Sequence, residues 1–378
     1  MLFVPSLEDI AVAKIAVDVY SDPAVMEMEM VSKIYKTPDK RWKPIIENLI
    51  PSRIYHKQLQ RKIIAMMRPI SYEYMLWKCS YVYFTGGQDP LPNDLHWKSD
   101  GTIDRLETAN LLIESATFPM TQRFRLACNC WLEEDVLKVW DKMDTRLQEA
   151  LIESYSCEHR DQYCAFHEIE VNVHKWIRWY EKRFENISRE ENWFLSYGLN
   201  SAFLHGYHPQ KLKPGEQQCF VKHALYEYAL PDDIRGCILL TEIGQRAELV
   251  KLRPYEVLQA FLLSPWQSLF MEMANHAWEH LSETCFLCLL HVLFCQRILL
   301  NWKDFDYVQL LQDFFNKSPD HFKEFVKDHE IYEPIILLIT RGRSVFDDLS
   351  QFLFHETCNI ECNYNSCVEE VLDLAYEE

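Results

Sequence analysis

Prolines and a few glycines interrupt this sequence at short intervals, leaving segments of about 10–25 residues between them. Within these segments apolar residues recur three and four positions apart, as in Leu106, Ala109, Leu112 and Ile113. That spacing is typical of amphipathic α-helices, whereas the alternation expected of strands is nearly absent. The chain also has only 9 glycines among 378 residues, and therefore few residues suited to tight hairpins. We predict an all-α fold, an irregular α-solenoid of paired helices.

The breaks also predict where helices begin and how the chain is divided. A proline follows a residue that can cap a helix at three places: Asp22-Pro23, Ser264-Pro265 and Ser318-Pro319. Paired helices are expected, without a pattern that repeats at a fixed period, in the segments 118–143, 228–250 and 305–327. The Gly- and Pro-rich stretch 85–100 is the expected boundary between an N-terminal helical module, residues 1–84, and a solenoid-like body, residues 101–378.

Charge and hydropathy argue against several classes of partner. The net charge is −18, with 39 Lys and Arg against 57 Asp and Glu, so the chain should repel phosphate backbones and anionic lipid surfaces. The most apolar stretch, residues 285–300, contains His291, Gln296 and Arg297 and is too short to cross a bilayer. We expect a buried helix there, and neither nucleic acid nor a membrane as a partner.

The cysteines and the first residues predict the compartment. The chain has 13 cysteines, an odd number that fits reduced thiols better than a disulfide framework. No secretory signal is expected at the start, because Glu8 and Asp9 interrupt it before an apolar region of useful length has formed. A cytosolic or nuclear protein is therefore expected.

The start of the chain carries the most informative pattern. Ser6 can cap a helix through its hydroxyl, and Asp9 can return its carboxylate to the same helix N-terminus. Leu7, Ala11 and Ile15 then share one face at helical spacing, and the small Ala11 would let a partner surface approach closely. The pattern fits a helix that binds a partner, or an end-capping helix packed on the solenoid.

This segment resembles the BC box of SOCS-box and VHL-box proteins, with Leu7, Ala11 and Ile15 at its leucine, small-residue and aliphatic positions. A second segment resembles the hydrophobic–proline element and short helix of the cullin box in the same families, through Ile50, Pro51, Ile54 and Leu59. The resemblance covers residues 5–60. It implies that the first helix binds elongin C, that the second element binds a cullin, and that the remaining helices recruit a protein substrate for ubiquitination.

One string suggests a different function. His276-Ala277-Trp278-Glu279-His280 matches the H-x-x-E-H pattern of inverted zincins, in which two histidines on one helix face bind zinc and the glutamate is the general base. Glu356 lies at a suitable separation to be a third ligand. A zinc-dependent hydrolase is therefore an alternative, although metallopeptidases with this pattern have mixed α/β domains. A surface helix face is the simpler interpretation.

Other clusters have simpler structural interpretations. Two groups of thiols and imidazoles could reach zinc but lack a C-x-x-C knuckle: Cys157, Cys164, His167 and His174, and His355, Cys358, Cys362 and Cys367. Cys285 and Cys288 form a C-x-x-C inside an apolar helical run, where buried thiols are expected. Between residues 174 and 189 bases alternate with aromatic residues that share one helical stripe: Trp176, Trp179, Tyr180 and Phe184. Core packing explains this stripe better than binding of single-stranded nucleic acid.

The sequence contains no P-loop, no dinucleotide-binding glycine motif and no serine-hydrolase motif. We therefore predict a protein-interaction adaptor without enzymatic activity, metal or cofactor, whose partners are elongin C and a cullin. A helical scaffold with no connection to a ligase is the alternative.

Overall fold

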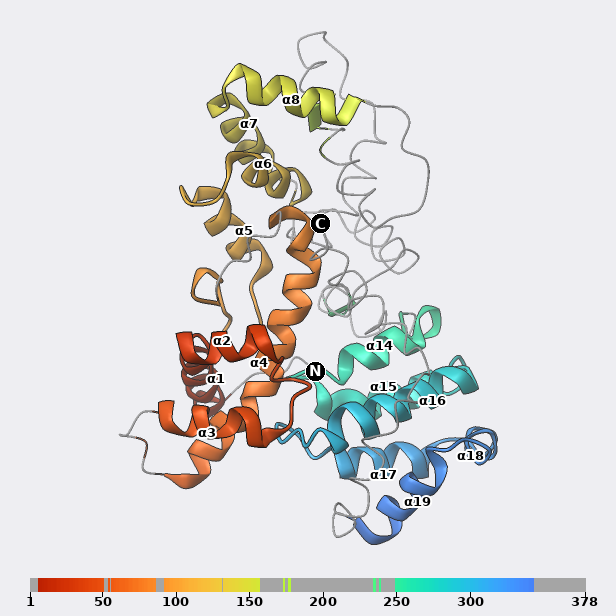
Figure 1. Ribbon diagram of the computed structural model, residues 1–378. Helices are drawn as coiled ribbons and strands as arrows, with labels where there is room; N and C mark the ends of the chain where they lie inside the picture. The colour runs from red at the N-terminus through yellow and green to blue at the C-terminus, as the bar shows by residue number, and fades with distance from the viewer. Residues whose placement is uncertain are drawn as a thin grey trace. The chain divides into compact units, whose positions relative to one another are not determined.

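The computed structural model describes residues 6–50, 54, 56–85, 92–130, 132–156, 173, 176–177, 234–235, 238 and 249–342. Within these ranges the chain forms helices and no β-strand, which confirms the predicted all-α fold (Figure 1). The solenoid arrangement stays a prediction. Among the described helices, none combines the length and the apolar character that a membrane span requires.

The chain divides into two compact units whose boundaries differ from the predicted ones. The first unit contains Met1–Leu76, Trp97–Thr102 and Thr241–Glu378, and the second contains Trp77–His96 and Ile103–Leu240. The sequence pattern instead separated residues 1–84 from residues 101–378. The N-terminal and C-terminal helices share one unit because their residues bury polar and aromatic groups against one another.

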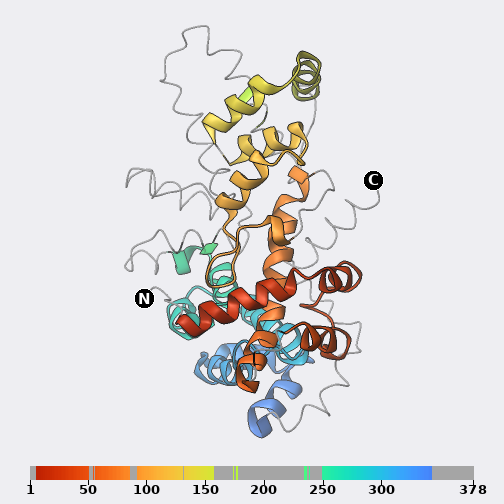
Figure 2. The ribbon, with the colours of Figure 1, turned by 90° about the vertical axis from the view of Figure 1, so that its left-hand side faces the viewer.

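The first unit contains helices from both ends of the chain. Its N-terminal elements are α1 (Leu7–Tyr20), α2 (Pro23–Val31), α3 (Asp39–Leu49) and the first part of α4 (Lys57–Thr85). The C-terminal elements are α14 (Pro254–Phe261), η3 (Gln267–Leu269), α15 (Phe270–Ala277), α16 (Glu283–His291), η4 (Val292–Leu299), α17 (Tyr307–Lys317), α18 (Asp320–Val326) and α19 (Tyr332–Arg341). Helix α1 contacts both α2 and α3, an arrangement that Figure 2 shows from a second direction.

A cluster of aromatic rings joins the C-terminal helices. The rings of Trp278 and Phe314 stack with centroids 5.2 Å apart, and those of Phe286 and Phe322 stack at 4.8 Å. Phe286 and Phe314 also contact each other at 5.0 Å, which joins the two pairs. Burial of each phenylalanine contributes about 1.5–3 kcal/mol, so this cluster is a main source of stability for α15 to α18.

Several predicted helix positions are confirmed. Asp22 caps α2 through its side chain and Pro23 is the first helical residue. The pair expected over 305–327 is α17 and α18, and the apolar stretch 285–300 forms α16 and the π-helical η4, both largely buried. Two of the predicted starts differ from the structure. Ser264-Pro265 begins no helix, since η3 begins at Gln267, and α18 begins at Asp320, one residue after Pro319.

The second unit contains the end of α4, η1 (Pro92–Asp94), α5 (Arg105–Glu114), α6 (Met120–Asn129), α7 (Glu133–Lys142) and α8 (Thr145–Ser156). The pair predicted over 118–143 is confirmed as α6 and α7, which pack against each other. Trp176 is buried and donates a hydrogen bond of 3.1 Å to the carbonyl of Cys128, which agrees with the predicted core role for this residue. Trp179, Tyr180, Phe184 and most of the pair expected over 228–250 lie outside the described residues.

Candidate functional site

Helix α1 begins with the capping box that the sequence predicts. The backbone N–H of Asp9 donates to Oγ of Ser6 at 3.2 Å, and the backbone N–H of Ser6 donates to Oδ2 of Asp9 at 3.0 Å. The Ser6 hydroxyl also donates to Oδ2 of Asp9, and this hydrogen bond lowers the pKa of that carboxyl. The start of the helix is therefore fixed at Leu7.

The two faces of α1 have different environments. One face carries Val12, Ala13, Ala16, Val19 and Tyr20, all buried against the rest of the unit. On the opposite face Leu7 is 86% exposed, Ala11 is exposed and Ile15 is half-buried. An exposed leucine is unremarkable alone, but here it stands on a helix that the fold already anchors through its other face. The predicted face of Leu7, Ala11 and Ile15 is thus accessible to a partner, mainly at Leu7 and Ala11.

The residues of the segment that resembles a cullin box are less accessible than Leu7 and Ala11. Ile50 is only 8% exposed and follows α3 directly, so its side chain is largely used within the fold. Ile54 and Leu59 are half-buried, and the carbonyl of Ile54 accepts a hydrogen bond of 2.8 Å from Nε2 of Gln60. Pro51 lies outside the described residues.

A groove of about 910 Å³ lies beside these residues and was not predicted. It is lined by parts of α1, α3, the start of α4 and the segment 301–304 that follows η4. Six basic residues line it: Lys43, Lys57, Arg61, Lys62, Arg68 and Lys303. Four acidic residues line it: Asp9, Asp39, Glu47 and Asp304. We call it the basic groove, because its lining carries more positive than negative residues on a chain whose net charge is −18.

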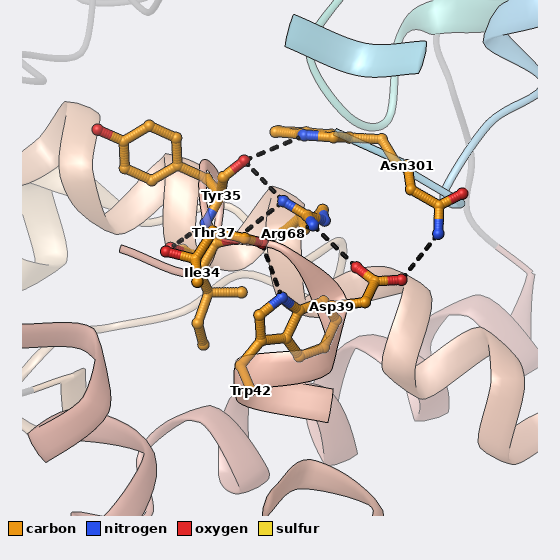
Figure 3. A network of polar contacts seen from close by, with 9 residues as sticks. Ile34, Tyr35, Thr37, Asp39, Trp42, Arg68 and Asn301 are labelled. Atoms are coloured by element: carbon orange, nitrogen blue, oxygen red, sulfur yellow. Dashed lines mark hydrogen bonds and ion pairs between the residues drawn. The ribbon is translucent and has the colours of Figure 1, made fainter. Parts of the chain in front are cut away.

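The base of the groove is held by Arg68, whose side chain is 2% exposed (Figure 3). Nη1 donates to the carbonyls of Ile34 and Tyr35, each at 2.9 Å. Nη2 donates at 2.8 Å to the carbonyl of Thr37 and to Oδ1 of Asp39. These bonds give the carbonyls of the turn between α2 and α3 a charged donor in addition to their neutral donors, the Thr37 backbone N–H and the indoles of Trp42 and Trp302. Arg68 therefore has a structural role.

The segment after η4 completes this network. Asn301 donates to Oδ2 of Asp39 at 2.8 Å, and Nε1 of Trp302 donates to the carbonyl of Tyr35 at 3.2 Å. The guanidinium of Arg297 lies 3.9 Å from the centroid of the Trp302 ring, and Arg297 as a whole is 2% exposed. A buried cation over an indole ring is held by the ring quadrupole. These contacts place residues 301–304 against α3 and α4.

Asp304 is the acidic group of the groove whose protonation is most altered. Its Oδ2 accepts hydrogen bonds from Nε2 of Gln267 at 2.8 Å and from the hydroxyl of Tyr307 at 3.0 Å. Oδ1 is buried without a hydrogen-bond partner. Burial raises the pKa of the Asp304 carboxyl to about 6, although the positive charge of Arg297 acts in the opposite direction.

The candidate zinc string does not form the expected helix face. Helix α15 ends at Ala277, and the backbone N–H of His280 donates to the Ala277 carbonyl at 2.9 Å. His276 thus lies in the last turn of the helix, whereas Glu279 and His280 follow it. Two histidines four residues apart share a face only within a continuous helix.

Among the residues that the structure describes, no group of three or more His, Cys, Asp or Glu side chains could hold a metal ion. Glu356 and both groups of thiols and imidazoles lie outside the described residues. Cys285 and Cys288 are free thiols on α16. Cys288 is buried and Cys285 is half-buried, where burial raises the pKa of the Cys285 thiol and makes its reactive thiolate scarcer.

Sequence reasoning missed Lys57 and Arg61 as candidate site residues. One signal was available, since the start of α4 carries lysine and arginine and no acidic residue in its first turn. Helices more often have acidic residues there.

Comparison with known proteins adds nothing to assign the site: no family model, no curated protein and no solved structure matches this chain.

Proposed function

We propose that this chain is a protein-interaction adaptor in which the exposed face of α1 binds elongin C. The observation that carries the proposal is the exposure of Leu7 and Ala11 on a helix whose other face is buried. A partner can therefore cover Leu7, Ala11 and the edge of Ile15 without unfolding the unit. The capping box supports the same role, because it holds the helix in a fixed conformation before the partner binds.

A cullin would complete the assembly, and the remaining helices would recruit a protein substrate for ubiquitination. Ile54 and Leu59 are the residues of the second element with side-chain surface left for this contact. Ile50 would support the element from within the fold, since it is buried. The assembly would be active in the cytosol or the nucleus.

Co-expression of the chain with elongin B and elongin C, followed by size-exclusion chromatography, tests the proposal. Leu7→Asp is the informative variant, because Leu7 is 86% exposed and its replacement leaves the core intact. Val31→Asp at the end of α2 is the matched control, because Val31 is 85% exposed and the change is of the same kind.

Co-elution of the wild type and the Val31→Asp variant, but not of Leu7→Asp, would support the adaptor function. No co-elution of the wild type would leave a helical scaffold without a ligase connection. Loss of co-elution in both variants would show that α1 is not the specific contact. The Leu7→Asp variant should keep the unfolding midpoint of the wild type, since substitution of an exposed residue changes the free energy of unfolding by about 0.5 kcal/mol or less.

A further inference from the structure

The charge of the basic groove is opposite to that of the chain as a whole. Its lining has six basic and four acidic residues, whereas the chain has 39 basic and 57 acidic residues. Two ion pairs within the lining, Arg68 with Asp39 and Lys43 with Glu47, cancel two charges of each sign, so four basic and two acidic residues remain. A volume of about 910 Å³ is enough for several side chains of a bound segment.

Two cations of the groove are available to a ligand. Lys62 pairs with Glu8 at 2.9 Å, but Lys57 and Arg61 are exposed and form no ion pair with any described residue. They lie one turn apart at the start of α4, so their side chains project from the same side of the helix. The positive end of the helix dipole adds to their charge, and no carboxylate in the first turn of α4 offsets it.

The groove also offers apolar surface. Ile64, Ala65 and Met66 of α4 line it and are half-buried, so part of each side chain is in contact with solvent. A ligand that placed carboxylates near Lys57 and Arg61 and apolar side chains near these residues would match the lining in both respects. A peptide segment that contains both acidic and apolar residues has this combination of groups.

We propose that the basic groove binds an acidic peptide segment of a partner protein, through Lys57 and Arg61 and the apolar side chains of α4. A nucleic acid or an anionic membrane is a poorer match, because either would extend beyond the groove toward a chain of net charge −18. A short peptide senses mainly the local positive charge, since the Debye length is about 8 Å at physiological ionic strength. This binding is independent of the elongin contact through Leu7.

Fluorescence anisotropy with the full chain tests the proposal. The probe is a short fluorescein-labelled synthetic peptide of glutamate and leucine, and the same peptide with lysine in place of glutamate is its control. Lys57→Glu/Arg61→Glu reverses both available charges of the groove. Lys40→Glu/Arg41→Glu is the matched control, because these two exposed residues of α3 lie outside the groove lining and the charge change is identical.

The acidic probe should bind the wild type, and its affinity should fall as salt is added. The groove variant should bind about tenfold more weakly, a difference of about 1.4 kcal/mol, and the control variant within about twofold of the wild type. If the reversed variant is unstable, Lys57→Ala/Arg61→Ala takes its place. It removes the charges without reversing them and should also weaken binding. Unfolding midpoints of all variants identify any loss of folded protein.

Four results would overturn the proposal. They are an equal loss in the groove and control variants, equal binding of the lysine peptide, tighter binding of labelled single-stranded DNA, and tighter binding of phosphatidylserine vesicles. A fifth result would reassign the groove to this chain itself. If Glu369→Gln/Glu370→Gln/Asp373→Asn raised the probe affinity about tenfold, the occupant would be the chain's own acidic C-terminal segment and not a partner.

Discussion

Asn301 donates a hydrogen bond of 2.8 Å to Oδ2 of Asp39, although 262 positions separate the two residues in the sequence. The other oxygen of the same carboxylate accepts from Arg68 at 2.8 Å. Asp39 therefore connects α3, α4 and the segment that follows η4. Asn301 has a φ of 59°, in the left-handed region that asparagine and glycine tolerate better than other residues.

Two substitutions of Asn301 should distinguish the contribution of its hydrogen bond to stability from the contribution of its backbone conformation. Asn301→Gly loses the bond to Asp39 but tolerates the positive φ, so the free energy of unfolding should fall by about 1.5 kcal/mol. Asn301→Ala loses the bond and also strains the backbone, which should lower stability by about 1 kcal/mol more. Urea unfolding measures both values. Equal stability of the two variants would contradict the backbone argument.

Replacement of Arg68 should be far more destabilising than replacement of an exposed arginine on the same helix. Arg68→Met keeps much of the apolar stem but removes the ion pair with Asp39 and one donor from each of three carbonyls. The free energy of unfolding should fall by about 3–5 kcal/mol. Arg61→Met is the control and should change it by about 0.5 kcal/mol or less. The network would not be structural if urea unfolding gave similar losses for both variants.

Asp304 should make stability depend on pH between about 4 and 6. Its pKa is about 6 in the folded state against an ordinary value of 3.8, so in this interval the folded state binds more protons than the unfolded state. The stability due to this group therefore decreases as pH rises, by about 1.4 kcal/mol between pH 5 and 7.5.

The variant Asp304→Asn removes this titration. Its stability relative to the wild type should increase by that amount over the same pH interval, whatever its absolute stability. Urea unfolding of both proteins at pH 5 and at pH 7.5 gives the difference. A stability difference that does not change with pH would show that Asp304 titrates near its usual pKa.

Ser6→Ala should weaken the start of α1. It removes the acceptor for the Asp9 backbone N–H and should lower the free energy of unfolding by about 1 kcal/mol. Ser6→Thr keeps a hydroxyl at the same position and should recover most of the loss. Hydrogen exchange at the Asp9 amide provides a local measurement and should be faster in Ser6→Ala alone. Unchanged exchange in that variant would argue against the capping box.

The sequence by itself determined the helices and several of their ends. The Ser6 and Asp9 capping box and the start of α2 at Pro23 depend on residues within one turn of each other, so a local pattern identifies them. The helix pairs α6 and α7, and α17 and α18, follow from apolar spacing along short segments. A local pattern also placed Leu7 and Ala11 on one face of α1. They are exposed because Val12 and Ala16 on the opposite face are buried.

Only the tertiary structure decided which parts of the chain lie together. No sequence periodicity pairs Asn301 with Asp39 or places Arg68 against the carbonyls of Ile34 and Tyr35, because these contacts form only after distant segments have packed. The basic groove depends on the same packing, since its lining comes from residues 9–68 and 301–304. A local motif such as His276 to His280 also needs a continuous helix, and in the structure that helix ends at Ala277.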